Sequence, residues 1–231
     1  MGEYFMPRVA VLKFPGTNCE EETVYAVREI SRVEAEIVWH EEFKWRMWDA
    51  VIIPGGFSYG DYGRAGLIAS WSRASRELVE AADNGIPILG ICNGFQVLVE
   101  LGLLPGALTV NIDGVFHAKW VKVKINNPKG PWLVLAENGQ IVEMPIAHGE
   151  GRYYHPEPHK IVVERPWIEY IGCNPNGSVA SIAGLGSSSG EILGLMPHPE
   201  RAAFDVQVPY PHTAGGKLFF ESIGLSLRRG W

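Results

Sequence analysis

Cysteine is scarce in this sequence and does not occur in pairs. The chain of 231 residues has three cysteines, Cys19, Cys92 and Cys173, at wide spacings. This odd number excludes a complete disulfide framework, and no Cys-x-x-Cys pair offers the ligand spacing of a zinc site. We therefore expect a reducing, cytoplasmic compartment and no bound metal.

Long apolar runs, basic clusters and nucleotide-binding loops are also missing. No segment approaches the roughly 18 consecutive apolar residues that a membrane helix needs. The net charge of -6 disfavours nucleic acid as a partner, because an acidic surface repels phosphates. No Gly-x4-Gly-Lys-Ser/Thr loop occurs, so we expect no ATP site in this chain. Residues 1–8 contain Glu3 and have no apolar core, so we expect no signal peptide.

What is present is the composition of an ordinary globular domain. Hydrophobic residues make up 46% of the chain and charged residues 20%, which is enough apolar side chain for a sizeable core. No repeat, low-complexity tract or linker interrupts the sequence. We predict a single domain over residues 1–231.

The first half alternates strand and helix patterns, which favours an α/β fold with a mostly parallel sheet. A capping box is expected at Thr17 or Asn18 with Glu20 or Glu21, beginning a helix that runs to about Ile30. Further helices are expected over 67–84 and 94–101, the first of them ending before Gly85. Short apolar runs predict strands at 9–12, 36–39, 50–53 and 86–91.

The second half predicts added antiparallel strands. Val121, Val123 and Ile125 alternate with lysines, as in a strand with one buried face. The turn 126–130 follows this strand. Further strands are expected at 133–135, 161–163, 179–182 and 192–195, and a last helix over 216–223.

The most informative segment is Gly90-Ile91-Cys92-Asn93-Gly94. A buried strand enters a turn of small residues and then a helix, which is the pattern of a nucleophile elbow. Side chains at Gly90 and Gly94 would collide with neighbouring backbone in so sharp a turn. A helix N-terminus favours thiolate over thiol, so Cys92 is the candidate nucleophile and the Asn93 N–H a candidate oxyanion donor. Cys19 and Cys173 lack this context and are interpreted as structural.

A thiolate nucleophile needs a proton donor for its leaving group, and His198 is the strongest of seven candidates. It follows an apolar strand in the segment Met196-Pro197-His198-Pro199-Glu200. Because residues i and i+2 of an extended segment project to the same side, Glu200 can orient the imidazole of His198. The prolines stiffen the backbone here.

Two loops can support this chemistry. Gly55 and Gly56 follow a predicted strand, and the bare backbone there can supply the second oxyanion donor, which we assign to Gly56. The loop His148-Gly149-Glu150 mixes charge with glycine and suits binding of a zwitterion, so His148 and Gly149 are candidate substrate contacts. His148 and Glu150 are also a rival base and orienter, but Gly149 leaves their backbone loose.

These residues resemble those of class I glutamine amidotransferases, whose mark is Gly-x-Cys-x-Gly-x-Gln followed late by His-x-Glu. More narrowly, the chain is similar to the family of glutaminase subunits of phosphoribosylformylglycinamidine synthases. The similarity covers nearly the whole chain, in the segments 14–19, 54–62, 90–96, 147–154, 174–178 and 196–201.

The resemblance implies a flavodoxin-like sheet with helices on both faces and a triad of Cys92, His198 and Glu200. It implies that Gln96 and the loop with Gly55 hold glutamine. It further implies that glutamine is hydrolysed to glutamate and ammonia, and that the ammonia serves a large synthetase subunit, in many organisms with a small third subunit. ATP and Mg are then expected on that partner, and no cofactor in this chain.

Three alternatives remain from the sequence. The same chemistry can serve a different synthetase. A cysteine peptidase-like protein can have a similar elbow and sheet. A non-catalytic regulatory subunit can keep the fold without the activity.

Overall fold

The structure is a computed structural model and describes residues 6–231. The expectation about a signal peptide concerns residues 1–8, and of these residues 1–5 lie outside the described part. In the described part, the main sheet has nine strands in the order β2-β1-β3-β4-β11-β10-β9-β6-β7. Its strands are β1 (Arg8–Lys13), β2 (Glu34–Trp39), β3 (Ala50–Ile53), β4 (Ile88–Ile91), β6 (His117–Asn126), β7 (Ile141–His148), β9 (Trp167–Ile171), β10 (Ile182–Gly186) and β11 (Ile192–Leu195).

The first five positions of the sheet are parallel, from β2 to β11. Their order is that of flavodoxin, so the predicted flavodoxin-like sheet is confirmed. β3 and β4 are buried at every position, as expected of strands covered on both faces. The carboxyl ends of β1, β3, β4 and β11 meet at one edge of the sheet, which is where open α/β sheets bind ligands.

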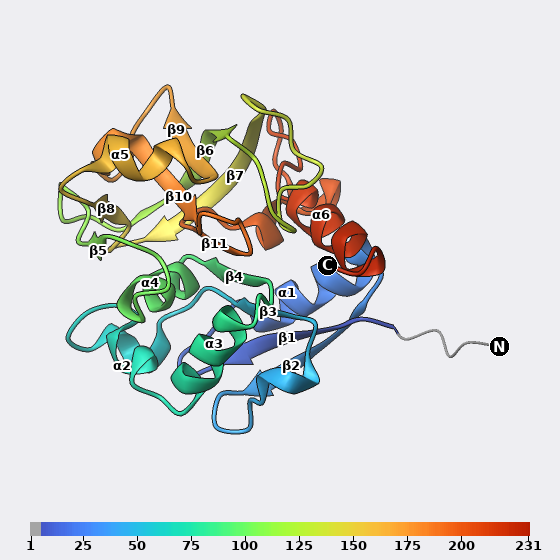
Figure 1. The fold of residues 1–231 in the computed structure, drawn as a ribbon. Coiled ribbons are helices and arrows are strands. Elements are labelled where there is room, and N and C mark those ends of the chain that lie inside the picture. Colours follow the sequence, from blue (N-terminus) through green and yellow to red (C-terminus); the bar gives the residue numbers. More distant parts are fainter. Residues whose placement is uncertain (1–5) are drawn as a thin grey trace.

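Helices cover both faces of this parallel half (Figure 1). The helix α1 (Glu20–Ala26) packs on β1 and β2, and α6 (Lys217–Arg228) packs beside it against the π-helix η1 (Val27–Ser31). On the other face lie α2 (Leu67–Ser70), α3 (Ala74–Asp83) and α4 (Asn93–Glu100), with α4 against β3, β4 and β11. The core consists of the apolar side chains between these layers.

The remaining strands are antiparallel, as predicted, and the structure shows that they extend the same sheet. β10 pairs with β11 and β9, and β6 pairs with β9 and β7. A separate two-stranded sheet joins β5 (Ala107–Thr109) to β8 (Arg152–Tyr154). Figure 1 shows this antiparallel part as the upper half of the molecule, above the parallel strands.

Three of the short strands predicted in the second half are wrong. Residues 161–163 belong to the helix α5 (Pro158–Val163), because Pro158 provides a helix start that the β-branched residues do not override. Residues 133–135 form turns whose Leu133 is buried while Val134 and Leu135 are half exposed. Residues 179–181 form the 3-10 turn η4, and the strand begins only at Ile182.

The first helix and the second also differ from expectation. Cys19, and neither Thr17 nor Asn18, precedes α1, and no side-chain cap bond forms. The Thr17 hydroxyl instead accepts a hydrogen bond from the Phe14 N–H at 3.0 Å, so the threonine stabilises the preceding turn. The helix predicted over 67–84 is broken into α2 and α3. The predicted Gly85 helix end is confirmed by its left-handed φ of 73°.

Among residues 6–231, no helix is both long enough and apolar enough to cross a membrane. The assignment of one domain to residues 1–231 stays a prediction from the sequence.

Candidate active site

Cys92 lies on a strained turn between β4 and α4. Its backbone has φ 51° and ψ -103°, a conformation that residues with a side chain adopt rarely. Such strain persists only where the surroundings fix it, and here the Cys92 N–H donates to the Leu195 carbonyl at 2.7 Å. β4 and β11 pair in register beside this turn. The predicted nucleophile elbow therefore forms, with Cys92 at its apex.

The two flanking glycines are required by space. A Cβ on Gly94 would lie 1.9 Å from the carbonyl oxygen of Ile53, and one on Gly90 would lie 2.6 Å from the backbone of Gly94. Both distances are far below van der Waals contact. Strand β3 and helix α4 approach this closely only because no side chain lies between them.

His198 and Glu200 form the hydrogen-bonded pair that the sequence predicts. His198 Nδ1 lies 2.5 Å from Glu200 Oε1, and both side chains are buried. His198 precedes the 3-10 turn η5 (Pro199–Ala202), and its N–H donates to the Pro145 carbonyl of β7 at 2.8 Å. The turn brings the carboxylate back under the ring, so the two side chains meet although the segment is not fully extended.

The electrostatics of this pair suit proton transfer. Burial lowers the pKa of His198, but the negative charges of Glu200 and Cys92 raise it more, and the net pKa lies well above the ordinary value. The imidazole therefore holds its proton beside the sulfur. The thiol of Cys92 also lies 3.6 Å from the Ala147 carbonyl of β7. An imidazolium next to a sulfur atom on a helix N-terminus is the arrangement that favours a thiolate nucleophile.

A second sulfur, that of Cys19, also lies near the ring, and the sequence interpretation missed it. Cys19 Sγ lies 4.0 Å from His198 Nδ1 and accepts a hydrogen bond from Arg201 Nη2 at 3.1 Å. Cys19 follows β1, so the same sheet edge brings it here. Burial raises the pKa of its thiol to about 11, which leaves it protonated and a poor nucleophile at neutral pH.

Gly55 and Gly56 lie directly beside this centre. A Cβ on Gly55 would be 2.6 Å from His198 Cε1, so the loop backbone packs against the imidazole. Gly56 has a φ of 149° and forms a bridge with Thr17, where a Cβ would strike the Asn18 nitrogen at 2.7 Å. Asn93 is the first residue of α4, and its N–H has no acceptor four residues earlier in the helix. Both candidate oxyanion residues thus border the site, and their donor role stays a proposal.

Gln96 lies in a buried polar network behind the elbow. Its side-chain amide donates to the Glu150 carbonyl at 2.7 Å and accepts from Asn93 Nδ2 at 2.9 Å. Asn93 Oδ1 in turn accepts the N–H of Ser58 at 3.2 Å. This network links the elbow to the loop after β3 and to the loop after β7. Both ends of the Gln96 amide contact protein here, so direct contact with glutamine stays a proposal.

The rival pair of His148 and Glu150 does not form. His148 Nδ1 lies 3.2 Å from Asn111 Oδ1, while the Glu150 carboxylate accepts the N–H of Ala65 at 3.2 Å. Burial, followed by the positive charge of His198, lowers the pKa of His148 to about 4, so its ring is neutral. Asn111 also accepts the Gly151 N–H at 3.0 Å, and this fixes the loop that includes Gly149. Asn111 gave no sequence signal beyond its residue type.

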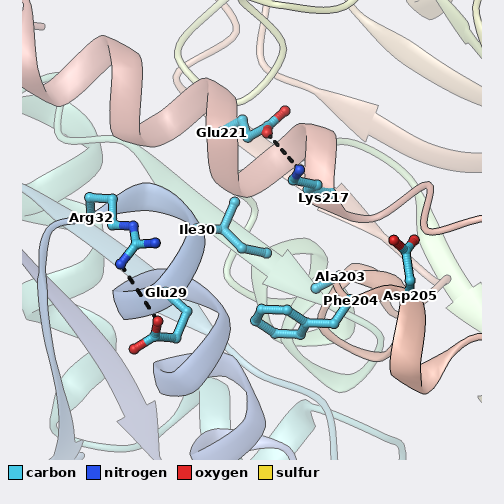
Figure 2. Close-up of a pocket in the computed structure, with 8 residues that line it drawn as sticks. All are labelled: Glu29, Ile30, Arg32, Ala203, Phe204, Asp205, Lys217 and Glu221. Atoms are coloured by element: carbon cyan, nitrogen blue, oxygen red, sulfur yellow. Dashed lines mark ion pairs between the residues drawn. The ribbon is translucent and has the colours of Figure 1, made fainter.

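Two pockets of the described part are relevant to the choice of a site. One, of about 280 Å³, is lined by Cys19, Gly56, His198 and Arg201, with Phe57 and Phe116 at its border. The other, of about 400 Å³, lies between η1, α6 and residues 203–205 (Figure 2). Four of its five charged side chains pair with each other, Arg32 with Glu29 at 3.6 Å and Lys217 with Glu221 at 3.3 Å. The smaller pocket borders the candidate triad, and we take it as the active-site pocket.

One group of side chains in the described part has the geometry of metal ligands. Single ligand atoms of Cys19, His198 and Glu200 lie within 4.8 Å of one another. The Arg201 guanidinium contacts this sulfur, and its positive charge opposes a cation there. The arrangement suits nucleophilic catalysis of acyl transfer by a cysteine and a histidine better than metal binding.

Comparison with known proteins agrees with this chemistry. Residues 6–223 match the CobB/CobQ-like glutamine amidotransferase domain family. A protein of Pyrococcus furiosus called phosphoribosylformylglycinamidine synthase subunit PurQ is 49% identical over 86% of this chain and 90% of its own. A protein of the same description from Pseudothermotoga lettingae is 42% identical over 96% of this chain and 97% of its own.

Solved structures with a similar fold include a protein described as a glutamine amidotransferase. A chain in the structure of PurLQS from Thermotoga maritima superposes with a TM-score of 0.86 at 39% identity, covering 96% of this chain and all of that one. Another protein of Thermotoga maritima, described as a glutamine amidotransferase, has a TM-score of 0.58 at 16% identity, covering 85% of this chain and 77% of that one, which shows a shared fold alone. The chain belongs to the CobB/CobQ-like glutamine amidotransferase domain family.

Proposed function

We propose that this chain is the glutaminase subunit of a phosphoribosylformylglycinamidine synthase. It hydrolyses glutamine to glutamate and ammonia for a synthetase subunit that makes formylglycinamidine ribonucleotide in purine biosynthesis. The observation that carries the chemistry is the strained Cys92 elbow beside the buried His198–Glu200 pair. Similarity to PurQ proteins at 42–49% identity over most of the chain supports the specific complex.

The reaction follows from the site. The Cys92 thiolate attacks the side-chain amide carbon of glutamine, and the N–H groups of Gly56 and Asn93 hold the resulting oxyanion. The C–N bond breaks as the His198 imidazolium gives its proton to the leaving ammonia. His198 then takes a proton from water, which attacks the thioester and releases glutamate. Glu200 keeps the imidazole oriented and stabilises its charge through both steps.

The substrate is held around this centre. We assign glutamine binding to Gly55 in the loop after β3, Gln96 in α4, His148 at the end of β7 and Gly149 directly after it. His148 is neutral, so it can accept or donate a hydrogen bond to the substrate without opposing the ammonium group by charge.

The partners are a large synthetase of the PurL kind and a small third subunit of the PurS kind. The neighbouring Thermotoga maritima structure is of a PurLQS assembly, in which these are the companions of a PurQ chain. ATP and Mg act on the synthetase, because this sequence has no phosphate-binding lysine loop. We place the complex in the cytoplasm, because three unpaired cysteines suit a reducing compartment.

The complex assembled from purified subunits tests this function. We expect glutamine-dependent formation of formylglycinamidine ribonucleotide, and loss of it in Cys92→Ala while ammonia-dependent synthesis persists. A Cys92→Ala complex that still uses glutamine would overturn the assigned nucleophile. Glutamine hydrolysis without amination of formylglycinamide ribonucleotide would show that the chain serves a different synthetase.

A further inference from the structure

Arg201 lies directly behind the buried His198–Glu200 pair. Its Nε atom donates to Glu22 Oε1 of α1 at 2.9 Å and lies 3.9 Å from Glu200 Oε1. Its Nη2 atom donates to Cys19 Sγ at 3.1 Å. One guanidinium therefore contacts a carboxylate and a sulfur that hold it in place, and its charge lies within ion-pair distance of the Glu200 carboxylate.

The Cys19 thiol separates this cation from the imidazole. Its sulfur lies 4.0 Å from His198 Nδ1 on one side and 3.1 Å from Arg201 on the other. Burial keeps the thiol protonated by raising its pKa to about 11, so the sulfur accepts the Arg201 hydrogen bond without adding a negative charge. Gly55 closes the remaining side, since a Cβ there would be 3.2 Å from this sulfur. The backbone of Gly55 thus limits the position of the sulfur, and the sulfur and the Glu22 carboxylate together hold the guanidinium.

We propose that Arg201 is a positioning residue for the triad: held by Glu22 and Cys19, its guanidinium fixes the Glu200 carboxylate and sets the pH range in which Cys92 and His198 are active. The role in turnover rests on the proposed glutaminase function. The effect on Cys92 itself depends only on the charges around it.

The direction of the effect follows from the sign of the charge. A guanidinium near the imidazole disfavours imidazolium and favours the Cys92 thiolate. Removing it should therefore raise the pH at which each group loses its proton. Removing the negative charge of Glu22 should lower it. The other titratable groups around His198 are unchanged in both variants. They are Cys19 after β1, Cys92 after β4, His148 at the end of β7 and Glu200.

The test is the pH dependence of Cys92 alkylation by iodoacetamide, followed at that residue by mass spectrometry of the intact protein's digest. For Arg201→Gln we expect the midpoint to rise by about 0.5 to 1 pH unit, since Arg201 is partly exposed and its charge partly screened. Arg201→Lys keeps the charge and should keep the midpoint. Glu22→Gln should move the midpoint in the opposite direction.

A role in packing alone would not give this pattern. The proposal would be overturned if Cys92 alkylation had the same pH midpoint in wild type and Arg201→Gln. It would also be overturned if Arg201→Gln and Arg201→Lys shifted that midpoint equally. If Arg201→Gln does not fold, Arg201→Met, which also removes the charge, decides in its place: an upward shift of the alkylation midpoint supports the proposal and an unchanged midpoint refutes it. Because alkylation needs no glutamine, a wild-type complex without glutamine turnover would refute the proposed function separately.

Discussion

Nδ1 of His198 lies 2.5 Å from Oε1 of Glu200, and both side chains are buried. Removing either partner would leave an uncompensated buried polar group or charge, which is strongly destabilising. The contact with Glu200 and the hydrogen bond from the His198 N–H to the Pro145 carbonyl together fix the orientation of the imidazole. Proteins tolerate the free-energy cost of such a buried pair at functional sites, which is the role that we propose for it.

Glu200→Gln tests the contribution of the carboxylate charge, because glutamine has nearly the same shape as glutamate but no charge. The amide can still contact the ring, but it cannot stabilise imidazolium and can select the wrong tautomer. We expect glutamine-dependent kcat to fall by roughly 10³-fold or more, with ammonia-dependent synthesis in the complex kept. Steady-state assays with both nitrogen donors measure this. Glu221→Gln on the exposed face of α6 is the matched control, and a Glu200→Gln enzyme as active as that control would contradict the assigned role.

His148 should make the fold sensitive to acid. Its pKa is about 4 in the folded chain, lowered mainly by burial, and near 6.5 when unfolded. As pH falls from 6.5 to 4, His148 binds a proton in the unfolded chain but stays largely neutral in the folded chain. The free energy of unfolding therefore falls in that window, by roughly 2 to 3 kcal/mol. The measurement is urea unfolding at pH 6.5 and at pH 4.5. We expect the free energy of unfolding to fall less between these two pH values in His148→Gln than in wild type.

His198 does not obscure that measurement. Its pKa is raised in the fold, so its contribution is fully present below the unfolded value and is lost only as pH rises above it. His159→Gln, at an exposed position, is the control substitution. If His148→Gln and His159→Gln lose the same stability on acidification as wild type, the buried neutral His148 is not the cause.

Much of the site could be predicted from the sequence because local chemistry determines it. The strand, the two glycines and the helix around Cys92 are contiguous, and each has a steric reason. His198 and Glu200 are two residues apart. Cys19 and Arg201 could not be recognised as neighbours, because their contact joins positions 182 residues apart through the order of the parallel strands. Asn111 was missed for the same reason, since its partners are His148, the last residue of β7, and Gly151, which are 37 and 40 residues away.

The fold was predictable in the parallel half of the sheet, where short strands are buried on both faces. β3 and β11 have the bounds that the sequence predicts, and both are buried at every position. The errors fall on three segments of three or four residues in the second half of the chain, 133–135, 161–163 and 179–182. Residues 161–163 are β-branched, but Pro158 begins a helix there, and no residue of that helix is buried. Periodicity cannot distinguish helix from strand over so few positions.

The space at Gly94 gives a stability prediction. An alanine there would place its Cβ 1.9 Å from the Ile53 carbonyl oxygen, so β3 and α4 must separate. We expect Gly94→Ala to lower the free energy of unfolding by about 2 to 3 kcal/mol or to prevent folding, as overpacking does in a rigid core. Gly149→Ala is the matched control, because the nearest atom to its Cβ is 3.7 Å away. Equal midpoints in urea unfolding of the two variants would contradict the close packing.

Two buried sulfur atoms, those of Cys19 and Cys92, lie near the imidazole of His198, and only Cys92 is assigned to the reaction. Trypsin separates Cys19 from Cys92, so rapid acid quenching of the complex with glutamine, followed by mass spectrometry, locates the glutamyl thioester. We predict the adduct on Cys92 in wild type and in Cys19→Ser, and none in Cys92→Ser. An adduct on Cys19, or one that survives in Cys92→Ser, would contradict Cys92 as the nucleophile.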